Sequence, residues 1–189
     1  MRVIAGTHRG RLLRGPKSPG VRPTSDRVKE ALFSIIGQRV MNTRFLDLYA
    51  GTGAVSIEAL SRGAAYVACV ESDANTLRLL RRNVQDCAMS HLITIHDQTV
   101  ARFLTHPARW EGPYQIVFAD PPYERSADLV ALLSDPVTDQ LFADDAWLLV
   151  EHAAKTALPA PLGSGCLLRR YRYGDTALSL YSRRGPAQP

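Results

Sequence analysis

The sequence predicts an α/β protein built on a doubly wound, mostly parallel sheet. From residue 44 onward, short apolar segments typical of buried strands alternate with segments of helical periodicity, as expected when helices cover both faces of a parallel sheet. The first of these strands runs into a glycine turn at Gly51 and Gly53, and the last two strand-like segments meet at Gly174-Asp175. These observations predict a seven-stranded sheet that ends in an antiparallel hairpin.

The elements follow in order along the chain. A first helix, Asp26–Ile36, has apolar residues at helical spacing, Ser25 or Asp26 as its N-cap and Gly37 at its end. Strands are expected at 44–49, 66–71, 92–96, 114–119 and 146–151, and the final hairpin at 167–173 and 176–181. Helices are expected at 53–62, 73–87, 98–105 and 126–134.

A basic segment precedes the sheet. Arg2–Ala5 and Arg11–Arg14 flank the turn Gly6–Gly10 and predict a small β-hairpin. Residues 1–44 hold ten Lys/Arg and two Asp/Glu, whereas residues 45–189 hold thirteen and sixteen. This asymmetry indicates a polyanionic partner that binds the basic segment, with a merely solubilising tail as the alternative. The predicted organisation is a basic hairpin arm (1–22), a main domain (23–184) and a frayed tail (185–189).

Length and composition restrict the class of protein. With 189 residues and 46% hydrophobic content, the chain can form one α/β domain with a small appendage. No apolar run approaches the roughly 20 residues that a membrane span needs, and the chain does not start with a signal peptide. The three cysteines (Cys69, Cys87 and Cys166) are odd in number and lack metal-ligand spacing. We therefore expect a cytoplasmic protein with reduced thiols and no metal.

The glycine turn predicts a nucleoside-binding crevice. Gly51 and Gly53 allow a ligand to approach the backbone closely at a helix start. A dinucleotide fingerprint would have a third glycine at position 56, which is Ser here. Asp47, in the strand before this turn, is expected to point its carboxylate toward the same crevice, where it would repel a phosphate but suits a ligand with an ammonium and a sulfonium group. These features favour S-adenosylmethionine (SAM).

Two further positions fit the same ligand. Glu71 ends the second predicted strand, where an acidic side chain can accept both ribose hydroxyls. NAD would accept this acid equally, so Glu71 indicates a ribose rather than one cofactor. Asp97 and Gln98 close the third strand and can reach an adenine amino group, although Asp97 could instead cap the next helix. Asp73 is expected to be the N-cap of its helix.

The most informative segment is Asp120-Pro121-Pro122-Tyr123, directly behind the apolar run 116–119. It lies at the carboxyl end of a strand, where open α/β sheets bind ligands. Two consecutive prolines stiffen the loop and remove two N–H donors. The Asp120 carboxylate and the Pro121 carbonyl can both accept hydrogen bonds from one exocyclic amino group, and Tyr123 can stack on the base that carries it. The alternative, an ordinary Asp-Pro turn, does not account for the residues upstream.

Together these residues resemble those of the bacterial 16S ribosomal RNA guanine-N2 methyltransferases of the RsmD type. The similarity covers nearly the whole chain. It is carried by Val3–Gly6 with Arg9–Arg11, by Arg22–Phe33, by Asp47–Gly53, by Asp120–Tyr123 and by Tyr173–Thr176. The Asp-Pro-Pro-Tyr motif alone would also fit amino-methyltransferases of DNA and of other RNAs.

The resemblance implies a Rossmann-like class I methyltransferase with SAM bound against Asp47, Gly51, Gly53 and Glu71. It implies that Asp120 engages the amino group of guanine 966 in the small subunit, with Tyr123 (often Phe in the family) beside it. Arg22 and Thr24 would lie near the methionine end of the cofactor, and Arg22 could pair with its carboxylate or with an RNA phosphate. The family favours a monomer that acts on protein-bound rRNA.

Other functions remain open at this point. A DNA adenine or cytosine amino-methyltransferase would need a target-recognition domain, for which the chain has no segment of sufficient size. A glutamine methyltransferase would typically have Asn in place of Asp120. A non-catalytic RNA-binding module with a vestigial pocket would retain RNA affinity without being stabilised by SAM.

Overall fold

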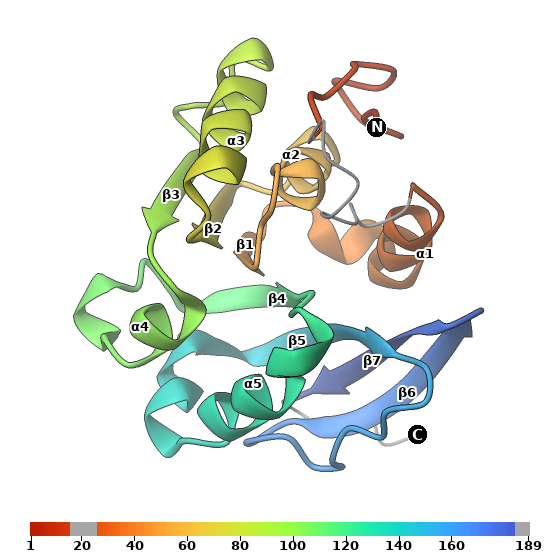
Figure 1. Cartoon of the computed structure of the whole chain (residues 1–189), viewed down its shortest axis with the longest axis vertical. Helices are drawn as coiled ribbons and strands as arrows, with labels where there is room; N and C mark the ends of the chain where they lie inside the picture. The colour runs from red at the N-terminus through yellow and green to blue at the C-terminus, as the bar shows by residue number, and fades with distance from the viewer. Residues whose placement is uncertain (16–25, 184–189) are drawn as a thin grey trace.

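The computed structural model describes residues 1–15 and 26–183. Its centre is one seven-stranded sheet in the order β3-β2-β1-β4-β5-β7-β6 (Figure 1). The strands are β1 (Arg44–Leu48), β2 (Tyr66–Glu71), β3 (Ile93–Asp97), β4 (Tyr114–Ala119), β5 (Phe142–Ala153), β6 (Cys166–Tyr173) and β7 (Thr176–Ser182). Strands β1 to β5 are parallel to one another, and β7 pairs antiparallel with both β5 and β6. The predicted fold class is confirmed.

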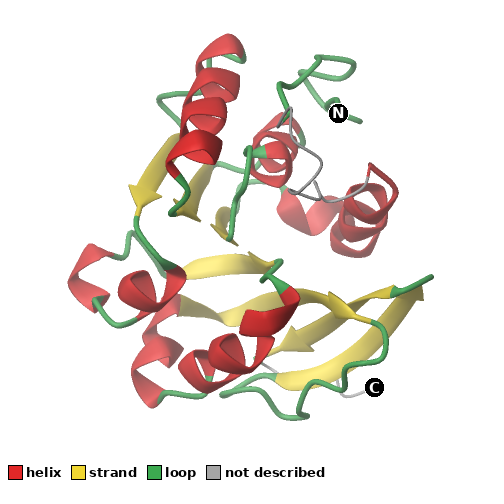
Figure 2. Cartoon of the chain, viewed as in Figure 1, coloured by secondary structure: helices red, strands yellow, loops and turns green. Residues whose placement is uncertain are grey.

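Helices cover both faces of the sheet (Figure 2). The α-helices are α1 (Asp26–Ile36), α2 (Ala54–Ser61), α3 (Ala74–Asp86), α4 (Val100–Leu104) and α5 (Ser126–Leu133). Short 3-10 helices, which the sequence analysis did not predict, are formed by Gly37–Val40, Pro107–Arg109, Tyr123–Arg125 and Pro136–Leu141. Asp73 caps α3 as expected, because its carboxylate accepts a hydrogen bond from the Thr76 N–H.

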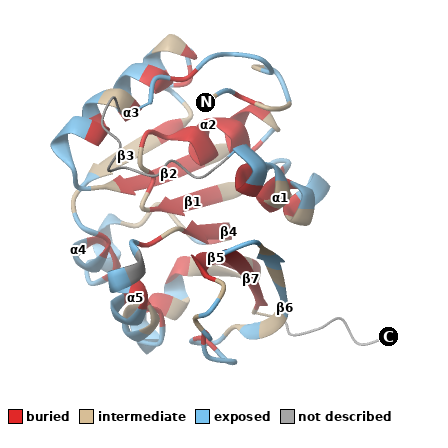
Figure 3. Cartoon of the chain, turned by 45° about the vertical axis from the view of Figure 1, so that its right-hand side comes forward, coloured by how far each residue is buried: buried red, intermediate tan, exposed pale blue. Residues whose placement is uncertain are grey.

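Alternation along the strands divides the interior into two hydrophobic cores. Phe45 and Phe118 face the core beneath α1, α2 and α3, whereas Leu46 and Val117 face the core beneath α4 and α5. The central strands are buried on both faces, which explains their nearly continuous apolar sequences (Figure 3). At about 25 cal/mol per Å², each fully buried Leu or Phe side chain contributes about 1.5–3 kcal/mol.

The N-terminal hairpin packs on the first of these cores. Its antiparallel pairing is confirmed but short: the structure has one isolated bridge, Arg2↔Leu12, instead of two extended strands. Val3 and Leu13 are buried against the helices, so the segment is anchored at both ends of the hairpin. It lies over α2 and α3 (Figure 1). The predicted boundary at 22/23 and the predicted tail at 185–189 lie outside the described residues.

The remaining structural predictions can be compared directly. All three cysteines are free: Cys69 and Cys87 are buried, and Cys166 is exposed. No helix in the described part of the chain is long and apolar enough to cross a membrane.

Candidate active site at the carboxyl edge of the sheet

The turn after β1 is held in an unusual backbone conformation. Tyr49, Gly51 and Gly53 have φ values of 72°, 56° and 82°. A positive φ is strained for tyrosine, and such strain is concentrated at functional sites. Gly53 also has no room for a side chain, because a Cβ atom there would lie 2.3 Å from Cδ1 of Leu80. Positive φ angles therefore favour glycine at both positions, and close packing against Leu80 also requires it at position 53. The turn leads directly into α2.

Asp47 is a fully buried carboxylate behind this turn. Oγ of Ser56, in the first turns of α2, donates a 2.6 Å hydrogen bond to its Oδ2. Oδ1 is buried and has no hydrogen-bond partner in the described part of the chain. Burial raises the pKa of Asp47 to about 7, assisted by the nearby charges of Asp120 and Glu71 and opposed by the hydrogen bond from Ser56. A buried acceptor with one unsatisfied oxygen suits a cationic ligand.

Glu71, at the end of β2, is held by backbone donors. Its Oε2 accepts a 2.9 Å hydrogen bond from the Gly51 N–H, and its Oε1 accepts from the N–H groups of Ser72 and Asp73 at 2.7 and 2.8 Å. These bonds fix the carboxylate beside the glycine turn while leaving lone pairs available. Glu71 therefore lies beside the glycine turn at the end of β2, and its contact with a ribose stays a prediction.

Asp97 and Gln98 reach the same edge, since Asp97 pairs with Glu71 in the register of β3 and β2. The Asp97 carboxylate forms an exposed 3.0 Å ion pair with Arg81 of α3. The cap of α4 is Thr99, whose side chain accepts from the Arg102 N–H, so Asp97 does not have the capping role considered above. Nε2 of Gln98 is buried without a hydrogen-bond partner among the described residues. That amide remains available to a ligand.

The Asp120 loop begins where β4 ends. Ala119 pairs with Leu48 on one side and Val150 on the other, which places Asp120 next to the turn after β1. Asp120 is partly buried and Pro121 is buried. The loop then closes into a 3-10 turn, with the Arg125 N–H donating to the Pro122 carbonyl at 2.8 Å. Asp120 is close enough to Asp47 to raise the pKa of the Asp47 carboxyl, so the two carboxylates lie near each other.

The structure thus brings most of the predicted site residues together at one edge of the sheet, on four adjacent strands. Of the others, Arg22 and Thr24 lie outside the described residues, and only the backbone of Tyr123 is described. Ser56, which positions Asp47, was not predicted as a site residue. Ser56 is nine residues from Asp47, and that spacing alone does not show that the two side chains meet. The contact can be predicted only once α2 is known to pack back over β1.

The chemistry of this donor set is that of acceptors for cationic, hydroxyl and amino groups. Four carboxylates (Asp47, Glu71, Asp97 and Asp120), the Pro121 carbonyl and the backbone at the start of α2 lie at this edge of the sheet, with one amide donor at Gln98. Within the described ranges, no group of three or more His, Cys, Asp or Glu side chains is arranged to hold a metal ion.

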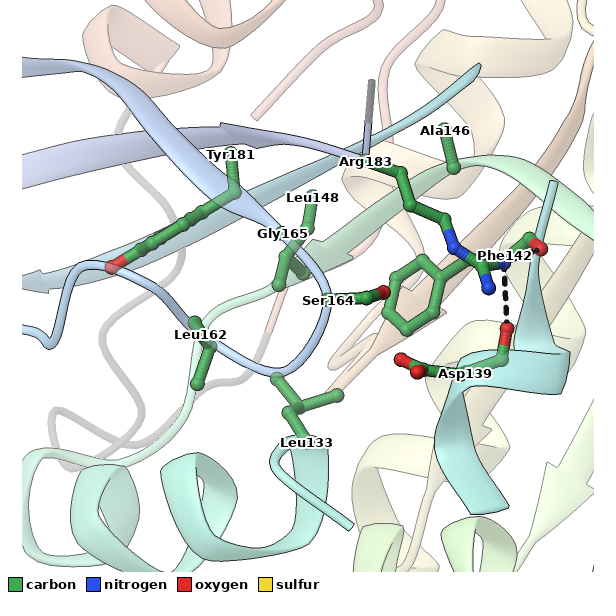
Figure 4. A pocket seen from close by; sticks show the side chains of 10 residues that line it. All are labelled: Leu133, Asp139, Phe142, Ala146, Leu148, Leu162, Ser164, Gly165, Tyr181 and Arg183. Carbon is green, nitrogen blue, oxygen red and sulfur yellow. Dashed lines mark hydrogen bonds between the residues drawn. The ribbon is translucent and has the colours of Figure 1, made fainter. Parts of the chain in front are cut away.

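A separate cavity lies away from this edge, between β5, β7 and α5 (Figure 4). Leu133, Leu162 and Tyr181 line it, and Arg183 closes one side with a 2.8 Å hydrogen bond to the Asp139 carbonyl. Its volume of about 20 Å³ accommodates about one water molecule. It is a packing defect rather than a substrate pocket.

Comparison with known proteins gives a consistent result. The family model described as "Conserved hypothetical protein 95" matches residues 1–182. "Ribosomal RNA small subunit methyltransferase D" of Escherichia coli K12 is 35% identical over 185 residues, covering 97% of this chain and 90% of the relative. "Putative rRNA methyltransferase YlbH" of Bacillus subtilis is 34% identical, covering 98% and 100%.

Solved structures agree in fold. The "Putative methyltransferase yhhF from Escherichia coli" superposes with a TM-score of 0.81 at 34% identity and covers 97% of both chains. A hypothetical protein from Thermus thermophilus gives a TM-score of 0.78 at 30% identity, covering 95% of this chain and 98% of that one. With a family model and full-length relatives matching along nearly its whole sequence, the chain belongs to the RsmD-type methyltransferase family.

Proposed function

We propose that this protein transfers a methyl group from SAM to the exocyclic N2 of a guanine in 16S ribosomal RNA, the base equivalent to guanine 966. The observation that carries the proposal is the convergence of Asp47, Glu71 and the Asp120-Pro121 loop at one sheet edge, in a chain of the RsmD-type family. The substrate is the small ribosomal subunit, and the protein acts as a monomer in the cytoplasm.

The residues present fit SAM. Glu71 accepts the ribose hydroxyls, and Asp97 with the buried amide of Gln98 lies where the adenine would be held. Asp47 provides a buried carboxylate oxygen toward the cationic part of the cofactor. When bound, SAM supplies a methyl group on a sulfonium, which is already a good leaving group. Arg22 and Thr24 complete the proposed cofactor site.

The acceptors at Asp120 act on the other reactant. An aromatic amine is a weak nucleophile because its lone pair is delocalised into the ring. Hydrogen bonds from the amine to the Asp120 carboxylate and the Pro121 carbonyl orient the nitrogen and stabilise the positive charge that develops on it. Such positioning can supply roughly 7–11 kcal/mol of the barrier. Extruding the base costs a few kcal/mol, and stacking on Tyr123 returns about 1–3 kcal/mol.

The hairpin provides the surface for the RNA backbone. Arg2 and Arg9 are exposed. Neither guanidinium group forms a salt bridge with any of the described residues. Arg14 and Arg11 point toward Asp86 of α3, where Arg14 forms a 3.1 Å ion pair and Arg11 donates to the carbonyl oxygen. We therefore assign the phosphate contacts to the guanidinium groups of Arg2 and Arg9.

The test is methyl incorporation into small subunits from a bacterial strain that lacks this activity. We expect one methyl group per subunit, mapped to N2 of the guanine, and no incorporation into duplex DNA. Asp120→Ala should reduce turnover by about 10²-fold or more, because the amine loses its main acceptor, while SAM binding is retained. Incorporation into DNA, or into another rRNA position, would contradict the proposed substrate; unchanged turnover in the variant would remove Asp120 from the mechanism.

A further inference from the structure

A further carboxylate, that of Glu151, lies beside the Asp120 loop. Val150 of β5 pairs with Ala119, the last residue of β4, so Glu151 and Asp120 each directly follow a residue of this pair. Adjacent parallel strands are about 4.8 Å apart, which brings the two carboxylates within reach of one small planar ligand. Glu151 is 7% exposed and is the buried acid nearest in register to the loop.

Both carboxylates lie on the same face of the sheet. Phe118 and Leu149, two residues earlier on β4 and β5, are in the core beneath α1, α2 and α3. Alternation within β5 returns the side chain to that face at Glu151, and Asp120, directly after β4, lies close enough to Asp47 to raise the pKa of that carboxyl. Leu178, the partner of Glu151 on β7, is in the same core, and Asp47 faces Ser56 of α2 on this side. Asp47, Asp120 and Glu151 therefore face a common region above three adjacent strands.

The chemistry of a guanine edge matches two neighbouring acceptors. N1–H and the N2 amino group are adjacent donors, and both are available in an unpaired base. An adenine has an acceptor at N1 instead, which a carboxylate repels.

We propose that Glu151 accepts a hydrogen bond from guanine N1–H while Asp120 and the Pro121 carbonyl hold N2, which makes Glu151 the residue that selects guanine. This assignment rests on the proposed function and extends it, because it separates recognition of the base from the transfer step. Sites built to bind a polar N–H reject analogues that lack it strongly, since a buried acceptor is then left unpaired.

The test uses small subunits reconstituted with 16S rRNA that carries either guanine or 2,6-diaminopurine at the target position. Both bases present the N2 amine, but N1 of diaminopurine is an acceptor. We expect the native protein to prefer guanine by about 100-fold or more in kcat/KM. Glu151→Gln presents an amide that can donate to N1 of diaminopurine, so it should lose about tenfold or more on guanine and shift the preference toward diaminopurine by a similar factor.

Asp144→Asn is the matched control. It removes one carboxylate charge from an exposed position on the same strand and should leave both rates unchanged. If Glu151→Gln slowed both substrates equally, its role would be structural and the inference would be overturned. The native preference tests the inference even if that variant fails to fold, because equal rates on the two bases would also overturn it. Absence of N2 methylation by the native protein on guanine would refute the proposed function instead.

Discussion

The substitution Asp47→Asn tests how far a buried, ionised carboxylate at this position lowers the free energy of unfolding. In the ligand-free protein, burial raises the pKa of Asp47 from 3.8 to about 7. Because one pKa unit is worth about 1.4 kcal/mol, the ionised form destabilises the fold by up to about 4 kcal/mol. The folded state binds the proton more tightly than the unfolded chain, so this stability is present below about pH 4 and is lost as the pH rises to about 7. Asparagine keeps an acceptor for Ser56 and does not titrate.

The measurement is urea unfolding of both proteins from about pH 5 to about pH 8 without ligand. We expect the free energy of unfolding of Asp47→Asn to rise relative to that of the native protein by about 2–3 kcal/mol between the two ends of this range. Taking the difference between the two proteins cancels other titrating groups. Saturating SAM should stabilise the native protein at the upper pH more than the variant, because only the native protein offers a carboxylate to the cofactor. A difference that stays flat with pH would refute the assignment of a raised pKa and its cause.

The remaining predictions concern the ribose acid, the hairpin and its anchor. Glu71→Ala removes three backbone hydrogen bonds and the ribose acceptor, so calorimetry should show SAM binding weakened by about tenfold or more; unchanged affinity would exclude a ribose contact. Arg9→Gln should lower the slope of log affinity for rRNA against log salt by about 0.7–0.9, whereas Arg102→Gln, an exposed change on α4, should not. Glu58→Gln leaves the buried ammonium of Lys29 without its nearest counter-ion and should cost about 3–5 kcal/mol in thermal or urea unfolding. Stability within about 0.5 kcal/mol of the native protein would mean that this ion pair does not hold the hairpin.

Sequence patterns predicted the strands because each buried parallel strand is a short apolar run between turn residues. They were less successful where pairing, not hydrophobicity, sets the length of a strand. β5 was predicted at 146–151 but runs from Phe142 to Ala153, since its start pairs with Tyr114 and its end with Thr176 of β7. The hairpin shows the reverse: the sequence pattern indicated two strands, but only one bridge forms because the segment bonds to α2 instead.

The site shows the same division. That Asp47, Glu71 and Asp120 lie at one edge could be predicted from the sequence, because the carboxyl ends of parallel strands meet at one edge, whereas their roles stay predictions. Their local partners could not: the bond from Ser56 depends on how α2 packs over β1. The contact of Asp97 with an adenine stays a prediction. It is compatible with the ion pair to Arg81, because that pair is exposed and leaves the Asp97 carboxylate accessible.

Helix α2 connects the proposed RNA surface to the proposed cofactor site. Its first residue follows the glycine turn, and one to two turns later Glu58 accepts hydrogen bonds from the Ile4 and Ala5 N–H groups at 2.7 and 3.0 Å. Burial lowers the pKa of Lys29, while Glu58 and Asp26 oppose that shift, and its Nζ also donates to the Arg2 carbonyl at 2.6 Å. The hairpin is thereby fixed by its backbone to a buried, eight-residue helix rather than tethered by a linker. The arginines proposed to contact phosphates and the acids at the sheet edge are thus held in one rigid frame, as in-line positioning of an extruded base would require.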